Sequence, residues 1–321
     1  MTCLANAIEL RNITKRFGQV VANKSISLEL HKGEILSLLG ENGSGKTTLM
    51  NMLSGIYYPD EGQIFVDGKE VEIRSPKDAF DLHIGMIHQH FKLVDVFTAA
   101  ENIILGLPGD KGKMDKNAVA KAVREIADRY GFDIDPNQKI YEMSVSQKQT
   151  VEIVKVLYRG ADILILDEPT AVLTPQETEK LFTVMRNMKK DGKAIIIITH
   201  KLHEVLAVSD RVAVLRKGEY IGDTDTATAS QQSLTDMMVG RAVSLNIDRP
   251  LNENQTERLK VEHLTVKNKE GVKMLDDVTF TAMGGEILGI AGIAGSGQKE
   301  LLESISGPVS YTHLRAHETE L

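Results

Sequence analysis

The chain is organised around the stretch Gly40-Glu41-Asn42-Gly43-Ser44-Gly45-Lys46-Thr47. It fits the pattern G-x-x-x-x-G-K-[ST], in which glycines let backbone N–H groups surround phosphate oxygens without a Cβ in the way. The apolar run at residues 34–39 predicts a buried strand before it, and leucines at helical spacing after residue 48 predict a helix behind it. The sequence therefore predicts a phosphate-binding loop between a strand and a helix.

Each part of this loop has an expected role. The following helix turns the positive end of its dipole towards the phosphates. Lys46 is expected to reach the β- and γ-phosphates, and the hydroxyl of Thr47 is expected to ligate Mg²⁺. The predicted nucleotide-binding residues of the segment are Gly40, Asn42, Gly43, Ser44, Gly45, Lys46, Thr47 and Thr48.

Composition narrows the class of protein. A length of 321 residues suggests about two domains, and an apolar fraction of 42% indicates ample core. The net charge of −7 argues against a nucleic-acid partner. The single Cys3 cannot form an intrachain disulfide, which favours a reducing compartment. We see no signal peptide and no apolar run of membrane-spanning length, so any membrane role is expected to depend on a partner.

Two continuous apolar runs end in residues suited to chemistry. Residues 163–168 end in Asp167 and Glu168, and residues 194–200 end in His200. Unbroken runs predict strands that are buried on both faces in a parallel sheet, whose carboxyl ends bind ligands in open α/β folds. We expect Asp167 to hold Mg²⁺, Glu168 to polarise water for attack on the γ-phosphate, and His200 to contact that phosphate.

Other candidates are weaker alone. Gln89 follows a predicted strand at residues 84–90 and is expected to meet the metal or water. Phe17 is a candidate stacking platform for a base, although such a ring is more often core. Ser146 and Gln149 fit a capping box, whose helix start is either an anion site or an ordinary cap. The His88–His90 pair lacks a third ligand and is interpreted as polar loop.

The chain then repeats itself. Residues 246–258 are polar and predict a linker, and residues 259–307 predict the start of a second copy of the domain. Residues 32–55 align without gaps on 284–307, with 11 identities over 24 positions. In the second loop Gln298 replaces the lysine and Lys299 replaces the hydroxyl. We expect this copy to be truncated after Gly307, and residues 308–321 to be a non-native tail, because they resemble the translation of a sequencing adapter.

With five motifs in order, the chain resembles the ATP-binding subunits of ABC importers. The motifs are the phosphate loop Gly40–Thr47, Gln89 as the Q-loop glutamine, the signature Ser144–Gln149, the metal-and-base strand Ile163–Glu168, and His200 as the switch histidine. The resemblance implies an α/β P-loop NTPase fold of ABC type, with a mixed sheet core, an antiparallel β part and a helical subdomain at about residues 95–160. The ABC domain is expected to span residues 1–245.

The resemblance is closest to the double-domain ATPases of simple-sugar and nucleoside importers. Three stretches carry it: residues 86–91, residues 168–174 and the second loop, which lacks the lysine. It implies that Phe17 stacks on adenine. It also implies phosphate contact by Ser144, Ser146 and Gln147, although the usual signature reads Leu-Ser-Gly-Gly-Gln. Thr174 stands where the family has an aspartate.

The implied cofactors are ATP and Mg²⁺. The implied partners are membrane permease subunits, touched near residues 91–96, an extracytoplasmic solute-binding protein and the second ABC domain of the intact chain. The implied place is the cytoplasmic face of the cell membrane. Residues 88–95 favour a nucleoside cargo over a sugar. Alternatives are an ABC-type ATPase of translation, which would carry basic character and two intact loops, and a nucleotide sensor, which would not need Lys46, Asp167 and Glu168.

Overall fold

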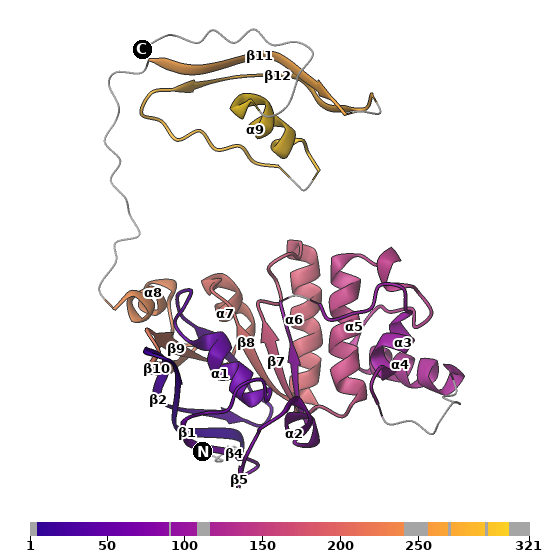
Figure 1. The fold of residues 1–321 in the computed structure, drawn as a ribbon, viewed down its shortest axis with the longest axis vertical. Coiled ribbons are helices and arrows are strands. Elements are labelled where there is room, and N and C mark those ends of the chain that lie inside the picture. Colours follow the sequence, from indigo (N-terminus) through magenta and orange to yellow (C-terminus); the bar gives the residue numbers. More distant parts are fainter. Residues whose placement is uncertain are drawn as a thin grey trace. The chain divides into compact units, whose positions relative to one another are not determined.

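The computed structural model describes residues 5–89, 91–107, 116–240, 256–268, 271–292 and 295–307. The chain divides into two compact units, Met1–Leu245 and Asn246–Leu321, which are treated separately (Figure 1). Most of the expected linker, the expected tail and His90 lie outside the described residues. No helix in the described part of the chain is both long and apolar enough to cross a membrane.

A six-stranded sheet forms the centre of the first unit, in the order β10-β9-β3-β8-β7-β6. The neighbours from β9 to β6 are parallel and β10 is antiparallel to β9. The residues of two central strands, 35–39 and 194–198, are apolar except for Ser37 and are all buried, as expected for parallel strands. The strands are β3 (Ile35–Leu39), β6 (Ile84–Ile87), β7 (Ile163–Asp167), β8 (Ala194–Ile198), β9 (Arg211–Arg216) and β10 (Glu219–Asp225).

The two faces of this sheet pack on different layers. Alternate strand residues such as Leu36 and Leu38 pack in a cluster with α1 (Lys46–Leu53) and the antiparallel sheet. Ile35 and its counterparts pack in a second cluster with α5 (Val145–Tyr158) and α6 (Pro175–Lys190) (Figure 1). The edge near β9 is covered by α7 (Leu202–Val208) and α8 (Gln231–Val239). The period of two along each strand thus produces two cores.

The antiparallel part is a four-stranded sheet in the order β2-β1-β4-β5. Its strands are β1 (Asn6–Phe17), β2 (Val20–His31), β4 (Glu61–Val66) and β5 (Lys69–Val71), followed by α2 (Pro76–Asp81). The Asp-Gly turn at residues 67–68 joins β4 to β5 in an antiparallel hairpin, as this dipeptide favours. β1 and β2 pair over their length with several register shifts, which let the pairing continue past breaks in the alternation of buried and exposed residues.

The segment between β6 and β7 is helical, as predicted, and contains no strand within its described residues. It holds α3 (Ala99–Ile104), α4 (Lys116–Tyr130), the short η1 (Ile140–Glu142) and α5. Apolar residues of α3, α4 and α5 form a cluster of their own, so these helices pack together as a layer beside the sheet.

The capping box of α5 differs from the prediction. Ser144, not Ser146, caps this helix: its hydroxyl accepts from the backbone N–H of Gln147 at 3.3 Å, and the side chain of Gln147 accepts from the backbone N–H of Ser144 at 2.9 Å. Both pairs have the same spacing, so the pattern alone does not separate them. Gln149 instead points inwards and donates to the carbonyl of Pro169.

In the second unit, β11 (Glu257–Lys267) and β12 (Lys273–Met283) form an antiparallel pair, and α9 (Gln298–Ser306) follows. Apolar side chains of both strands and Leu301 of α9 form a small cluster. Residues 286–292, which align with the strand before the first phosphate loop, are not in a strand.

Candidate nucleotide-binding site

The phosphate loop is a tight turn from β3 into α1. Gly40 has φ +154° and Gly45 has φ +98°. A Cβ on Gly40 would lie 2.3 Å from the carbonyl oxygen of Leu215, and one on Gly45 would lie 2.4 Å from that of Ala22. The loop thus requires glycine at both positions, because any larger residue would collide with backbone atoms of β9 or β2.

Lys46 folds back over this turn. Its Nζ donates to the carbonyl oxygens of Gly40 at 2.7 Å and Glu41 at 2.9 Å, and its side chain is nearly buried. Burial lowers the pKa of this ammonium, and the carboxylates of Glu168 and Asp167 partly offset that effect. A buried cation held among carbonyls is poised to meet an anion.

Asp167 and Glu168 stand at the carboxyl end of β7. Burial, with a smaller contribution from the neighbouring Glu168, raises the pKa of Asp167, while Lys46 lowers it. A carboxylate that is held away from water beside a second carboxylate is stabilised by a cation. The nearby oxygen donors, the hydroxyl of Thr47 and the amide of Gln89, line the same cavity, and oxygen ligands are those that Mg²⁺ prefers. The residues present therefore fit a magnesium ion.

The carboxylate of Glu168 is hydrogen-bonded to the other two predicted catalytic residues. Nε2 of Gln89 donates to its Oε2 at 3.3 Å, and Nδ1 of His200 lies 3.1 Å from its Oε1. The backbone of Glu168 is left-handed, with φ +47°, a conformation that costs a residue other than glycine about 1–2 kcal/mol. Its N–H donates to the carbonyl of Ile198 at 2.9 Å, a bond from β7 to β8 that helps to hold this strained turn.

These groups surround one cavity of about 580 Å³, a size suited to a small-molecule ligand. Gly40 and His200 do not line it but contact residues that do. The predicted residues that line it are Asn42, Gly43, Ser44, Gly45, Lys46, Thr47, Thr48, Gln89, Asp167 and Glu168.

Sequence reasoning missed part of the lining. Lys217 and Gly218, from the turn between β9 and β10, and residues 20–22 of β2 also face this cavity. The N–H of Gly218 donates to the carbonyl of Ser44 at 3.1 Å, so the turn is tied to the phosphate loop. No motif marks Lys217, and only the sheet order brings it there.

Some predicted residues lie elsewhere. Ser146 and Gln147 line a different cavity, of about 290 Å³, together with residues of α6, and Ser144 caps α5. Phe17 is 43% exposed and meets Tyr57 edge-to-face, so it is not core, but it does not line the phosphate-loop cavity. Within the first unit, the signature residues and the phosphate loop thus belong to separate sites.

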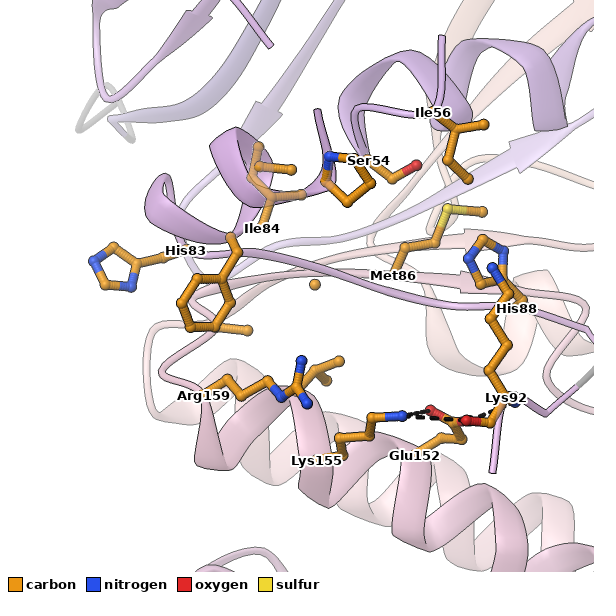
Figure 2. A pocket seen from close by; sticks show the side chains of 16 residues that line it. Ser54, Ile56, His83, Ile84, Met86, His88, Lys92, Glu152, Lys155 and Arg159 are labelled. Carbon is orange, nitrogen blue, oxygen red and sulfur yellow. Dashed lines mark hydrogen bonds and ion pairs between the residues drawn. The ribbon is translucent and has the colours of Figure 1, made fainter. Parts of the chain in front are cut away.

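A third cavity, of about 230 Å³, lies between α2, β6 and α5 (Figure 2). Its rim is charged: the backbone N–H of Lys92 donates to Glu152 at 2.7 Å, and Nζ of Lys155 lies 3.6 Å from the same carboxylate. Arg159, the residue that follows α5, projects into the cavity opposite Met86 and His88 of the β6 side (Figure 2). Burial lowers the pKa of Arg159 and of His88.

The fold and the loop define a P-loop nucleotide-binding cassette. Residues 23–171 match the family described as "ABC transporter". The crystal structure of the ADP conformation of MJ1267, an ATP-binding cassette of an ABC transporter, superposes with a TM-score of 0.65 at 26% identity, over 74% of this chain and 99% of that one.

Two curated relatives are similar over most of the chain. The nucleoside import ATP-binding protein NupA of Lactococcus lactis is 48% identical over 301 residues, which are 94% of this chain and 60% of that protein. The ribose import ATP-binding protein RbsA 1 of Rubrobacter xylanophilus is 43% identical over 301 residues, 94% of this chain and 59% of that protein. The domain that holds residues 23–171 belongs to the ABC transporter family, and the chain spans about 60% of the length of these relatives.

Proposed function

We propose that this chain is the ATP-binding part of an importer and that it hydrolyses ATP to drive uptake of a small solute through separate permease subunits. The observation that supports this most directly is the meeting of Lys46, Asp167 and Glu168 around one cavity, with Gln89 and His200 hydrogen-bonded to Glu168. A lysine for phosphates, a carboxylate for a metal and a base for water are the parts that phosphoryl transfer to water requires.

The residues divide the chemistry between them. Thr47, Gln89 and Asp167 would hold Mg²⁺, which when bound neutralises phosphate charge. Backbone N–H groups of the loop and Lys46 bind the phosphates. Glu168 accepts the proton of the attacking water, and the bonds from Gln89 and His200 orient its carboxylate. We further propose that His200, which is hydrogen-bonded to Glu168, contacts the γ-phosphate.

The signature residues need a second domain. Because Ser146 and Gln147 face a cavity other than that of the phosphate loop, we infer that they contact nucleotide held by another domain. In the intact protein the second ABC domain fills that role. Residues 1–321 contain one lysine-bearing loop and one signature, so two first units must pair for efficient turnover.

We infer the cargo and the membrane partner from the names of the similar proteins. Their names indicate nucleoside or ribose import, and the higher identity to the nucleoside importer agrees with a nucleoside cargo. We place the permease contact at residues 91–96, beside the charged cavity of Figure 2, since Lys92 belongs to both. An extracytoplasmic binding protein would deliver the solute, and the chain would act at the cytoplasmic face of the membrane.

The purified full chain tests the enzymatic part. We expect it to bind ATP in the presence of Mg²⁺ by calorimetry, and to release phosphate at a rate per chain that rises with protein concentration. Turnover that is independent of concentration would contradict pairing, and a chain that does not bind ATP would contradict the site.

Expression with its neighbouring permease and binding-protein genes tests the transport part. We expect the chain to co-purify with the permease in detergent and the cells to take up labelled nucleoside faster than labelled ribose. Co-purification with ribosomes would instead favour the translation alternative, against which the net charge of −7 already argues.

A further inference from the structure

The two residues after Glu168 are held by side chains from distant parts of the chain. The carbonyl of Pro169 accepts from Nε2 of Gln149 at 2.7 Å, and the carbonyl of Thr170 accepts from Nζ of Lys201 at 2.9 Å. Gln149 lies on α5, five residues after the signature serine Ser144, and Lys201 directly follows His200. The turn that carries the base is thus tied to two other functional segments.

A buried carboxylate closes this network. The hydroxyl of Thr170 donates to Oε2 of Glu204 at 2.5 Å, and Nζ of Lys201 lies 3.0 Å from Oε1 of the same residue. Lys201 also donates to the Thr170 hydroxyl at 3.2 Å. Glu204 is 5% exposed and Thr170 is 2% exposed. A carboxylate so far from water persists only when it is paired and hydrogen-bonded, and here both conditions hold.

The side chain of Gln149 uses only its donor group. Its Oε1 is buried and has no hydrogen-bond partner among the described residues. An apolar side chain of similar size would avoid leaving a buried acceptor unpaired. The amide therefore serves the carbonyl of Pro169, next to the strained backbone of Glu168.

We propose that Gln149, Thr170, Lys201 and Glu204 form a clamp that positions the carboxylate of Glu168 for hydrolysis. None of the four lines the phosphate-loop cavity, so they are positioning residues rather than catalytic ones. The clamp fixes the turn after β7 from two sides, from α5 and from the start of α7. It rests on the proposed ATPase function, because it acts through the base of that reaction.

Removal of the Thr170 hydroxyl is the first test, in the purified full chain. Thr170→Val keeps the shape but leaves Glu204 and Lys201 without that partner. We expect kcat to fall about 10- to 100-fold, while the ATP dissociation constant stays within about twofold of wild type. Thr170→Ser, which restores a hydroxyl, should recover most of the lost turnover. The control Thr183→Val removes an exposed hydroxyl that bonds only within α6 and should behave as wild type.

Two further variants separate positioning from simple stability. Glu204→Gln keeps the shape and an acceptor oxygen but removes the charge that faces Lys201, and it should also lower kcat more than ATP affinity. In a Glu168→Gln background, Thr170→Val should have no further effect on turnover, since the group that it positions is already gone.

The outcomes are distinct. A wild-type chain that never hydrolyses ATP would refute the proposed function. An active wild type with Thr170→Val and Glu204→Gln both within about twofold of its kcat would refute the clamp alone. Parallel losses of melting temperature, ATP affinity and turnover in both variants would also overturn it, because they would show a purely structural role.

Discussion

The two phosphate-loop sequences of this chain lead into their helices in the same way but lie in dissimilar surroundings. Gly45 and Gly297 both adopt a left-handed backbone before a helix, with φ +98° and +86°. A Cβ on Gly40 would lie 2.4 Å from Oγ of Ser44, and one on Gly292 would lie 2.3 Å from Oγ of Ser296. The described parts of the two loops therefore share the left-handed glycine before the helix and the close approach of the first glycine to the serine.

The surroundings decide what the turn can do. Ile35, which leads into the first loop, is fully buried between β8 and β9, whereas the aligned Ile287 is 90% exposed and outside any strand. At the lysine position, Gln298 donates to the carbonyl of Ile290 at 3.1 Å. A catalytic loop needs both a cation and the acids that neighbouring strands bring to it, and local sequence supplies neither acid.

The largest expected effect tests whether all turnover belongs to the first loop. Glu168→Gln removes the proposed general base, so we expect phosphate release to fall about 10²- to 10⁴-fold while bound ATP is retained. Glu303→Gln, an acid on the helix after the second loop, is the matched control and should leave turnover unchanged. Unaltered turnover in Glu168→Gln would remove this residue as the base.

The second prediction tests the two aligned isoleucines. Ile35→Ala removes a fully buried side chain and should lower the free energy of unfolding of the first unit by about 2–5 kcal/mol. Ile287→Ala removes an exposed one and should change stability by no more than about 0.5 kcal/mol. Urea unfolding measures both, and equal losses would show that residues 286–292 are packed in solution.

The third prediction compares the lysine with the glutamine that replaces it. Lys46→Ala removes a charged donor from the phosphate site and should weaken ATP binding about 10- to 100-fold. Gln298→Ala should leave ATP affinity unchanged, because the second loop lacks the lysine and the neighbouring acids. Calorimetric titration of each variant with ATP measures the two affinities. Comparable weakening in Gln298→Ala would mean that the second loop also binds ATP.

The smallest expected effect concerns the buried carboxylate of Asp167 beside the first loop. Because the pKa of Asp167 is raised in the folded protein, loss of its proton costs stability as pH rises through that pKa. Asp167→Asn should therefore melt about 2 °C higher than wild type at pH 8 without Mg²⁺. The gain should shrink as pH falls and Asp167 takes up its proton.

Differential scanning fluorimetry across pH measures this change, with the exposed Asp128→Asn as a control. A lower melting temperature for Asp167→Asn at pH 8 would show that the attraction between Asp167 and Lys46 outweighs the burial of the carboxylate.

Much of the fold was predictable, because its signals are local. The run before Gly40 and the continuous apolar runs that lead to Asp167 and His200 each depend on neighbouring residues. The meeting of Gln89, Glu168 and His200 was also expected, since carboxyl ends of parallel strands share one edge of a sheet.

What escaped prediction depends on contacts that no short pattern contains. Lys217 reaches the cavity only because β9 lies beside β3. The clamp joins Thr170 to Glu204 across 34 residues and Gln149 to Pro169 across 20. The capping box was misplaced by two residues, since Ser144 and Ser146 present the same spacing to a glutamine. The exposure of Ile287 could not be inferred from its sequence, because an apolar run forms a buried strand only where neighbouring strands pair with it.

The left-handed backbone at Glu168 narrows which replacements that position accepts. Glycine and asparagine relax there, whereas valine and isoleucine would be strained. A duplicated domain released from selection for hydrolysis is therefore expected to drift towards glycine or asparagine at this site before it accepts a β-branched residue. The identity of this one residue then serves as a record of whether a cassette still has to break a phosphate bond.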